Sequence, residues 1–194
     1  MLGFPYRVEN DANSAAYAEL KGMTKNTVYL ALSNTVGGAV CLHGRLHSGE
    51  NFRGGEFGHM IIQKGGRPLL LRSKRLCGYY CSARLLQQLG GDSLEEILCE
   101  TASGRSGLQR CWEEYLDYLA ITVTNLRVSF DCDVVLGGYV GGYLEEFRGQ
   151  LDRKVMEYNL FDLDTSYLKT GRYKLEAAAY GAALPFVDGF LEII

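Results

Sequence analysis

The stretch from Thr27 to His43 reads TVYLALSNTVGGAVCLH. Its two ends, residues 27–32 and 38–43, are rich in residues that favour β-strands. The segment SNTVG between them carries residues typical of turns. The stretch therefore predicts two strands that pair as an antiparallel hairpin.

The residues on either side of the hairpin predict a helix before it and a further strand after it. Upstream, a polar loop over residues 8–13 leads into strong helix formers at 15–20, and Gly22 lies where a glycine commonly ends a helix. Downstream, the glycine-rich segment 44–58 leads into an apolar run at residues 60–62, MII. We expect a third strand in that run.

The second half of the chain predicts helices that alternate with strands. A long helix is expected from Leu108, because one face carries apolar residues at steps of three or four: Leu108, Trp112, Leu116, Leu119, Val123 and Leu126. Further helices are expected over residues 79–89, 93–99, 143–158 and 175–194, the last kinked at Pro185, and strands over residues 134–136 and 167–169. The sequence predicts one α/β domain over residues 1–194, with a mixed sheet flanked by helices.

The composition limits the classes of partner. The 194 residues contain 20 Lys and Arg against 23 Asp and Glu, so the net charge is −3 and no basic stripe is visible. We expect no nucleic-acid partner. The six cysteines are widely spread, no apolar run reaches the ~18 residues of a membrane span, and the first residues do not resemble a signal peptide. These features predict a reduced, cytoplasmic protein with no membrane partner.

The polar residues Glu9, Asn10 and Asp11 precede the first predicted helix. An aspartate held there can accept the proton of a sugar hydroxyl, which is the role of the base in phosphoryl-transfer enzymes. Asp and Asn also cap helices, so helix capping is the alternative interpretation.

Glu56 and His59 lie three residues apart in the glycine-rich segment. A carboxylate and an imidazole accept and donate hydrogen bonds in fixed directions, as the recognition of neighbouring hexose hydroxyls requires. The alternative interpretation is an exposed loop with a structural histidine.

Two glycine pairs, Gly37-Gly38 and Gly137-Gly138, follow predicted strands. Such pairs would let the backbone approach a phosphate or an adenosine of a cofactor, although many are ordinary turns.

Cys77 and Cys81 are the only two cysteines close together in the sequence. With His59 they would supply part of a metal site, but two thiols do not complete the tetrahedron that zinc prefers. Buried structural cysteines are the alternative, and we predict no metal site.

Three segments, taken in order, resemble the ROK family of bacterial sugar kinases and sugar-responsive repressors. Residues 8–19, VENDANSAAYAE, look like the family's VENDANAAAxAE segment. Residues 54–60, GGEFGHM, contain its GExGHM signature, and residues 135–138, VLGG, are similar to its strand and glycine pair. The resemblance spans nearly the whole chain and implies the actin/hexokinase-like, or ribonuclease H-like, fold.

The resemblance also implies residue roles. Asp11 would be the catalytic base and Asn10 a sugar ligand. Glu56 and His59 would contact sugar hydroxyls, and the pair Gly137-Gly138 would lie beside the adenosine of ATP.

The chain departs from the family pattern in its phosphate-binding segments. Residues 33–39, SNTVGGA, align with the family's GTGxGxG segment but lack three of its glycines. No D-x-G-x-T phosphate loop precedes Asp11. The resemblance therefore implies a C-terminal lobe without its N-terminal lobe.

The chain also departs from the family's zinc segment, with which residues 68–82 align without a gap. This register places leucines at the cysteine positions and Gly78 at a sugar-binding glutamate; the leucines are Leu69, Leu71 and Leu76. A gap of one residue would align Cys77 with the third cysteine. On the ungapped register no zinc is expected.

These features predict a sugar-binding domain of a degenerate ROK protein, either a NagC-like transcriptional regulator or a pseudokinase, with a small sugar as its ligand. The alternative is an ATP-dependent, glucokinase-like hexose kinase whose other lobe lies outside this chain, with ATP and Mg as its cofactors. A structural or dimerising remnant is a third class, and homo-oligomers are compatible with all three.

Overall fold

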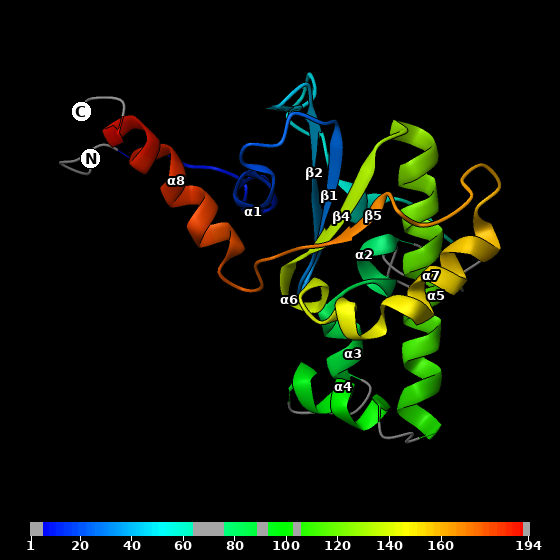
Figure 1. Ribbon diagram of the computed structural model, residues 1–194. Coiled ribbons are helices and arrows are strands. Elements are labelled where there is room, and N and C mark those ends of the chain that lie inside the picture. The colour runs from blue at the N-terminus through cyan, green and yellow to red at the C-terminus, as the bar shows by residue number, and fades with distance from the viewer. Residues whose placement is uncertain (1–5, 64–75, 89–92, 103–105, 192–194) are drawn as a thin grey trace.

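A mixed β-sheet forms the centre of the fold. Within residues 6–63, 76–88, 93–102 and 106–191, which the computed structural model describes, five strands pair in the order β3-β2-β1-β4-β5 (Figure 1). They are β1 (Thr27–Leu32), β2 (Val36–Leu42), β3 (Arg45–Leu46), β4 (Asp133–Gly137) and β5 (Leu168–Thr170). β1 pairs antiparallel with β2 and parallel with β4, and β4 pairs parallel with β5. The predicted α/β class is confirmed.

Helices cover both faces of this sheet. They are α1 (Asp11–Leu20), α2 (Cys77–Tyr80), α3 (Ala83–Gln88), α4 (Leu94–Ala102), α5 (Ser106–Phe130), α6 (Gly138–Gly141), α7 (Arg148–Tyr158) and α8 (Ala177–Leu191), with short 3₁₀ helices η1 (Phe57–His59) and η2 (Leu144–Phe147). Figure 1 shows α5 and α7 on one side of the sheet and α1 and α8 on the other.

The larger core lies between the sheet and α5. Leu116, Leu119 and Val123 of this helix are fully buried with Leu30 and Leu136 of the strands. The predicted long helix is confirmed, because its repeat of three and four residues turns one apolar face toward the sheet. Among the described residues, no helix has an apolar stretch long enough to cross a membrane.

The predicted hairpin is also confirmed, with β2 beginning two residues earlier than expected. Leu32 faces Val36 in the register, so the connecting turn consists of residues 33–35. The backbone N–H of Ser33 donates to the carbonyl oxygen of Thr35 at 3.1 Å and closes the turn.

The first helix begins earlier than the predicted start at residue 15. The side-chain oxygen of Asn10 accepts hydrogen bonds from the N–H groups of Ala12 and Asn13, so Asn10 is the N-cap and Asp11 the first helical residue. Gly22 has φ +80° just after the helix, as predicted.

The predicted third strand at residues 60–62 is wrong. Ile61 makes only an isolated bridge with Leu76, and β3 lies earlier, at Arg45–Leu46. The carbonyl oxygen of Met60 accepts the N–H of Cys77 at 2.8 Å, so this short run is held by the start of α2.

The contact between α1 and α8 depends on Gly181. A Cβ atom at this position would lie 1.7 Å from the carbonyl oxygen of Ser14, so only glycine permits the observed approach of the two helices. At the other end of the contact, Asp188 accepts hydrogen bonds from Tyr17 at 3.1 Å and Lys21 at 2.5 Å.

The Gly181→Ala variant is expected to lose ~1–3 kcal/mol of unfolding free energy, because the added methyl group forces α8 away from α1. The matched control is Gly189→Ala in the same helix, where a Cβ meets nothing within 4 Å. Since alanine is the better helix former, the control should gain ~0.5–1 kcal/mol. Urea unfolding measures both, and equal midpoints for the two variants would contradict the packing argument.

Candidate functional site

Asn10 and Asp11 occupy the start of α1. Asn10 Oδ1 lies 2.9 Å from Ala12 N and 3.1 Å from Asn13 N, which is the geometry of a helix cap. Asp11 is exposed, and its Oδ1 accepts the N–H of Ala12 at 2.8 Å. The structure thus assigns capping to Asn10 and leaves the Asp11 carboxylate exposed at the start of α1.

A small cavity of about 90 Å³ brings Asp11 together with two of the candidate glycines. Gly37 and Gly138 line it, and so do Lys174 and Ser33. The cavity is therefore bordered by a carboxylate, a hydroxyl and close backbone, while the Lys174 ammonium lies over the Tyr143 ring, 3.9 Å from its centre. This set of groups suits a small polar or anionic ligand.

The buried tyrosine Tyr29 also lines this cavity. Its hydroxyl has no hydrogen-bond partner among the described residues. Burial, together with the nearby Glu19 carboxylate, raises the pKa of Tyr29, so the hydroxyl keeps its proton at neutral pH.

The four candidate glycines divide into two groups. A Cβ on Gly38 would lie 2.3 Å from the Phe57 ring, and one on Gly137 would lie 2.3 Å from Tyr29 Oη. Packing within the protein therefore explains why both positions are glycine. Gly37 and Gly138 remain beside the cavity, and Gly138 has φ +78°, a conformation that favours glycine.

Glu56 and His59 lie together on the loop that crosses β2. His59 Nε2 is 3.9 Å from Glu56 Oε2, and the two side chains are 78% and 52% exposed. The loop packs closely against β2, because a Cβ on Gly58 would lie 2.2 Å from the carbonyl oxygen of Val36. The prediction that these two residues face one ligand is compatible with this placement.

A larger cleft of about 310 Å³ lies beside His59. It is lined by three elements: the hairpin turn with Thr35, the loop with His59, and helices α2 and α3 with Gly78 and Arg84. Thr35 lines this cleft and also the small cavity beside Asp11. The hairpin turn therefore separates the Asp11 side from the His59 side of one candidate site. Glu56 is not among the lining residues of either hollow, but its Oε2 lies 3.9 Å from Nε2 of His59, which lines the cleft.

Cys77 and Cys81 point into the core. The Thr122 hydroxyl oxygen lies 3.5 Å from Cys77 Sγ and 3.9 Å from Cys81 Sγ, and both cysteines are fully buried. Burial raises the pKa of the Cys81 thiol, whereas the hydrogen bond with Cys81 lowers the pKa of Cys77. Among the described residues, no group of three or more His, Cys, Asp or Glu side chains could hold a metal ion. Leu69 and Leu71, two of the leucines at the family's cysteine positions, lie outside the described residues.

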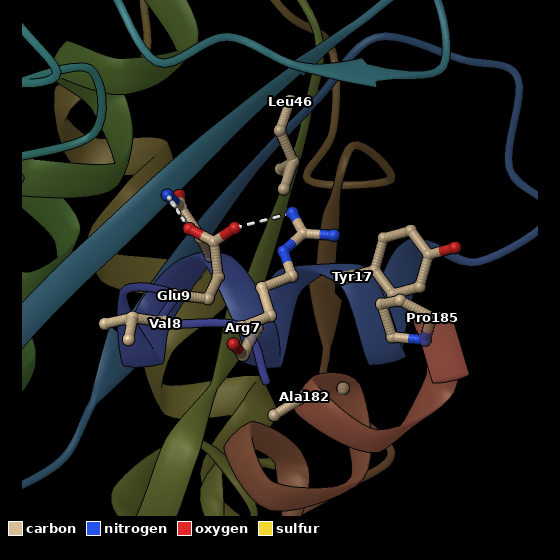
Figure 2. Close-up of a pocket in the computed structure, with 10 residues that line it drawn as sticks. Arg7, Val8, Glu9, Tyr17, Leu46, Ala182 and Pro185 are labelled. Carbon is tan, nitrogen blue, oxygen red and sulfur yellow. Dashed lines mark hydrogen bonds and ion pairs between the residues drawn. The ribbon is translucent and has the colours of Figure 1, made fainter. Parts of the chain in front are cut away.

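A further pocket of about 380 Å³ lies between α1, α8 and the segment before α1. Figure 2 shows Arg7 and Glu9 paired at its edge, at 2.8 Å, with Tyr17, Leu46 and Pro185 around it. None of the four predicted polar site residues lines this pocket. The pocket is therefore separate from the candidate site.

Sequence reasoning missed Lys174, Tyr29 and Arg84. Each comes from a segment that carries no motif, and each reaches the site through the topology of the fold. No local pattern distinguishes these side chains from those of other surface or core positions.

Comparisons with known proteins agree with the architecture. A family model described as "ROK family" matches residues 1–187. The N-acetylmannosamine kinase of Salmonella arizonae is 28% identical over 197 residues, which cover 95% of this chain and 65% of that protein. The chain thus spans less than two thirds of the length of this relative.

Solved structures share the fold. A ROK family protein from Streptococcus pneumoniae in complex with sucrose matches with a TM-score of 0.81 at 23% identity, over 97% of this chain and 68% of that one. A ROK family transcriptional regulator, described as a homologue of the E. coli MLC protein, matches with a TM-score of 0.75 at 20% identity, over 94% and 52%. The fold that the sequence motifs imply is confirmed.

The Asn10→Ala variant is expected to lose ~1 kcal/mol of unfolding free energy, because the N–H groups of Ala12 and Asn13 lose their acceptor. The Asn10→Asp variant should stay within a few tenths of the parent, since aspartate caps helices equally well. Urea unfolding of the three proteins decides the matter. Parent-like stability of Asn10→Ala would show that capping is not the role of this residue.

Proposed function

The chain belongs to the ROK family, and from that premise we propose that it is a sugar-binding unit whose ligand lies along hairpin turn 33–35, between Asp11 and His59. The observation that carries the proposal is that Thr35 lines both hollows. One ligand lying across the turn would contact a carboxylate on one side and an imidazole on the other. Hydroxyl groups are the ligand atoms that such a pair binds best, because they donate and accept.

The proposed output of the chain is sugar binding and not catalytic turnover. Phosphoryl transfer depends on positioned phosphates, and the segment 33–39 carries Ser33, Asn34 and Thr35 in its first three positions. The backbone at Gly38 and Gly137 is covered by protein atoms. These features support a sugar-responsive regulator or a pseudokinase.

The sugar class follows from the relatives. The curated relatives at 27–28% identity are named N-acetylmannosamine kinases. We therefore place N-acetylated hexosamines first among the ligands, followed by glucose and mannose.

Sugar binding is expected to depend on the Glu56 and His59 pair. Each of Glu56→Gln and His59→Ala should weaken binding of N-acetylmannosamine about fivefold or more, because each removes a hydrogen bond worth ~1 kcal/mol or more. Isothermal titration calorimetry measures the affinities, with N-acetylglucosamine, glucose and mannose as comparison ligands.

The matched controls for these variants are Glu50→Gln and His47→Ala, which alter exposed side chains on the same glycine-rich segment. Both should bind like the parent. Equal affinity of the Glu56 and His59 variants and the parent would remove these residues from the site.

Phosphoryl transfer is the second candidate function, and the cavity beside Asp11 favours it. Its lining contains the exposed Asp11 carboxylate, the Ser33 hydroxyl and the backbone of Gly138. In a kinase, Asp11 would accept the proton of the sugar hydroxyl while ATP and Mg supply the phosphoryl group and its charge neutralisation. Gly138 would then lie toward the phosphates.

We expect no hexose-dependent release of ADP above background by the 194-residue chain, because the phosphate-binding segment lacks three family glycines. A coupled ADP assay over the same four sugars measures this, with Asp11→Asn as the comparison. Turnover of ~1–100 per second that disappears in Asp11→Asn would promote the kinase function. The Asp11→Asn protein should unfold like the parent, because Asn10 still caps α1.

A further inference from the structure

We propose that the pocket between α1, α8 and residues 7–9 binds a free α-amino acid with an aromatic side chain. In this assignment Arg7 pairs with the carboxylate of the ligand, Glu9 pairs with its ammonium, and the aromatic ring lies against the apolar walls. The pocket shares no lining residue with the two hollows of the proposed sugar site. The proposal is therefore independent of sugar binding.

The apolar walls of the pocket are the first observation. Its volume is about 380 Å³, and its apolar lining consists of Val8, Tyr17, Leu46, Ala182 and Pro185. Val8 is 87% exposed, so this side chain leaves water when a ligand fills the pocket. The volume lies within the ~300–1,000 Å³ typical of small-molecule sites, and such walls favour a ligand with an apolar body.

Tyr17 supplies an aromatic ring to these walls. Its hydroxyl donates to Asp188 of α8 at 3.1 Å, so its polar end is already bonded and its ring is left for a ligand. Figure 2 shows this ring and Pro185 at the same end of the pocket. Aromatic rings pair favourably edge to face or with an offset, which favours an aromatic side chain in the ligand.

The ion pair at the edge of the pocket is the second observation. Arg7 Nη2 donates to Glu9 Oε2 at 2.8 Å (Figure 2). This is the only hydrogen bond that Arg7 makes with a described residue, so its other N–H donors are available for a carboxylate. Glu9 Oε1 accepts from Asn10 N at 3.1 Å and from Asn13 Nδ2 at 3.4 Å, whereas Oε2 accepts from Arg7 alone and has a lone pair left for an ammonium.

The two opposite charges of this pair determine the charge of the ligand. A ligand with a single charge is attracted by one member of the pair and repelled by the other. A zwitterion is attracted by both members, because it presents a carboxylate to Arg7 and an ammonium to Glu9. An α-amino acid carries these two groups on one carbon, next to its side chain. It therefore matches a pocket that has one ion pair at the edge and apolar walls.

Ser14 is the third observation. This residue of α1 lines the pocket and is only 4% exposed. Its hydroxyl makes no hydrogen bond with another described residue. A nearly buried hydroxyl without a partner is costly, so a ligand that accepts its hydrogen bond is favoured. We place one carboxylate oxygen of the ligand on Ser14 and the other on Arg7.

Calorimetry with L-phenylalanine tests the proposal against analogues that each lack one part of the ligand. 3-Phenylpropionate lacks the ammonium, phenethylamine lacks the carboxylate and glycine lacks the aromatic ring. The parent should bind phenylalanine about tenfold or more tightly than each analogue, because each analogue loses a charge-assisted contact or the apolar contact.

Two variants separate the two charges. Arg7→Gln should remove the preference for phenylalanine over phenethylamine, because the carboxylate loses its partner. Glu9→Gln should remove the preference over 3-phenylpropionate and still accept the hydrogen bond of Asn10 N. Ser14→Ala should weaken phenylalanine and 3-phenylpropionate by the same factor and leave phenethylamine unchanged.

The matched controls are Arg45→Gln and Glu50→Gln, which alter exposed charged residues that do not line the pocket. Both should bind phenylalanine like the parent. Circular dichroism and thermal unfolding establish that all the variants are folded.

Several outcomes overturn the inference. Equal affinity of the parent for phenylalanine and 3-phenylpropionate would remove the ammonium from the ligand, and equal affinity for phenethylamine would remove the carboxylate. Parent-like binding in both Arg7→Gln and Glu9→Gln would place the ligand elsewhere on the protein. Failure of all four compounds to bind would contradict the proposed amino-acid site, while the sugar titrations would still decide the proposed function.

Discussion

The fold depends on the absence of side chains at the ends of β2 and β4, the two strands that flank β1. Glycine at positions 37 and 38 of β2 lets α1 approach one face and the loop of Phe57 approach the other. Glycine at position 137 of β4 leaves room for the buried hydroxyl of Tyr29. Methyl groups at these positions would push apart the sheet, the first helix and the histidine loop. The candidate site exists because these elements meet at close range.

The hairpin turn then divides this region into two chemically different sides. On one side the Asp11 carboxylate and the Ser33 hydroxyl border a small cavity. On the other side the His59 imidazole borders a larger cleft, with the Glu56 carboxylate 3.9 Å from its Nε2.

The sequence predicted most of the fold, because long periodic segments such as α5 and the hairpin carry their own pattern. The predicted strand at residues 60–62 is wrong, because three apolar residues are too few to show the periodicity of a helix or a strand. Tertiary contacts with α2 determine the conformation of this run. Asp11 and His59 were predicted from their local sequence and given roles by the resemblance, and they line hollows on the two sides of one turn. Lys174 and Arg84 could not be predicted, since a single charged residue without a motif gives no sign of where the topology will bring it.

The pairing of α1 with α8 has a consequence for how the molecule is made. Tyr17 and Asp188 are 171 residues apart in the chain, yet they form a hydrogen bond. At a synthesis rate of ~5–20 residues per second, α1 leaves the ribosome roughly 10–30 seconds before its partner helix. During translation the surface of α1 that contains Ser14 and Ala18 is uncovered, and chaperones have access to it. Because it joins residues so far apart in the chain, this contact requires the closure of a long loop, which raises the contact order of the fold.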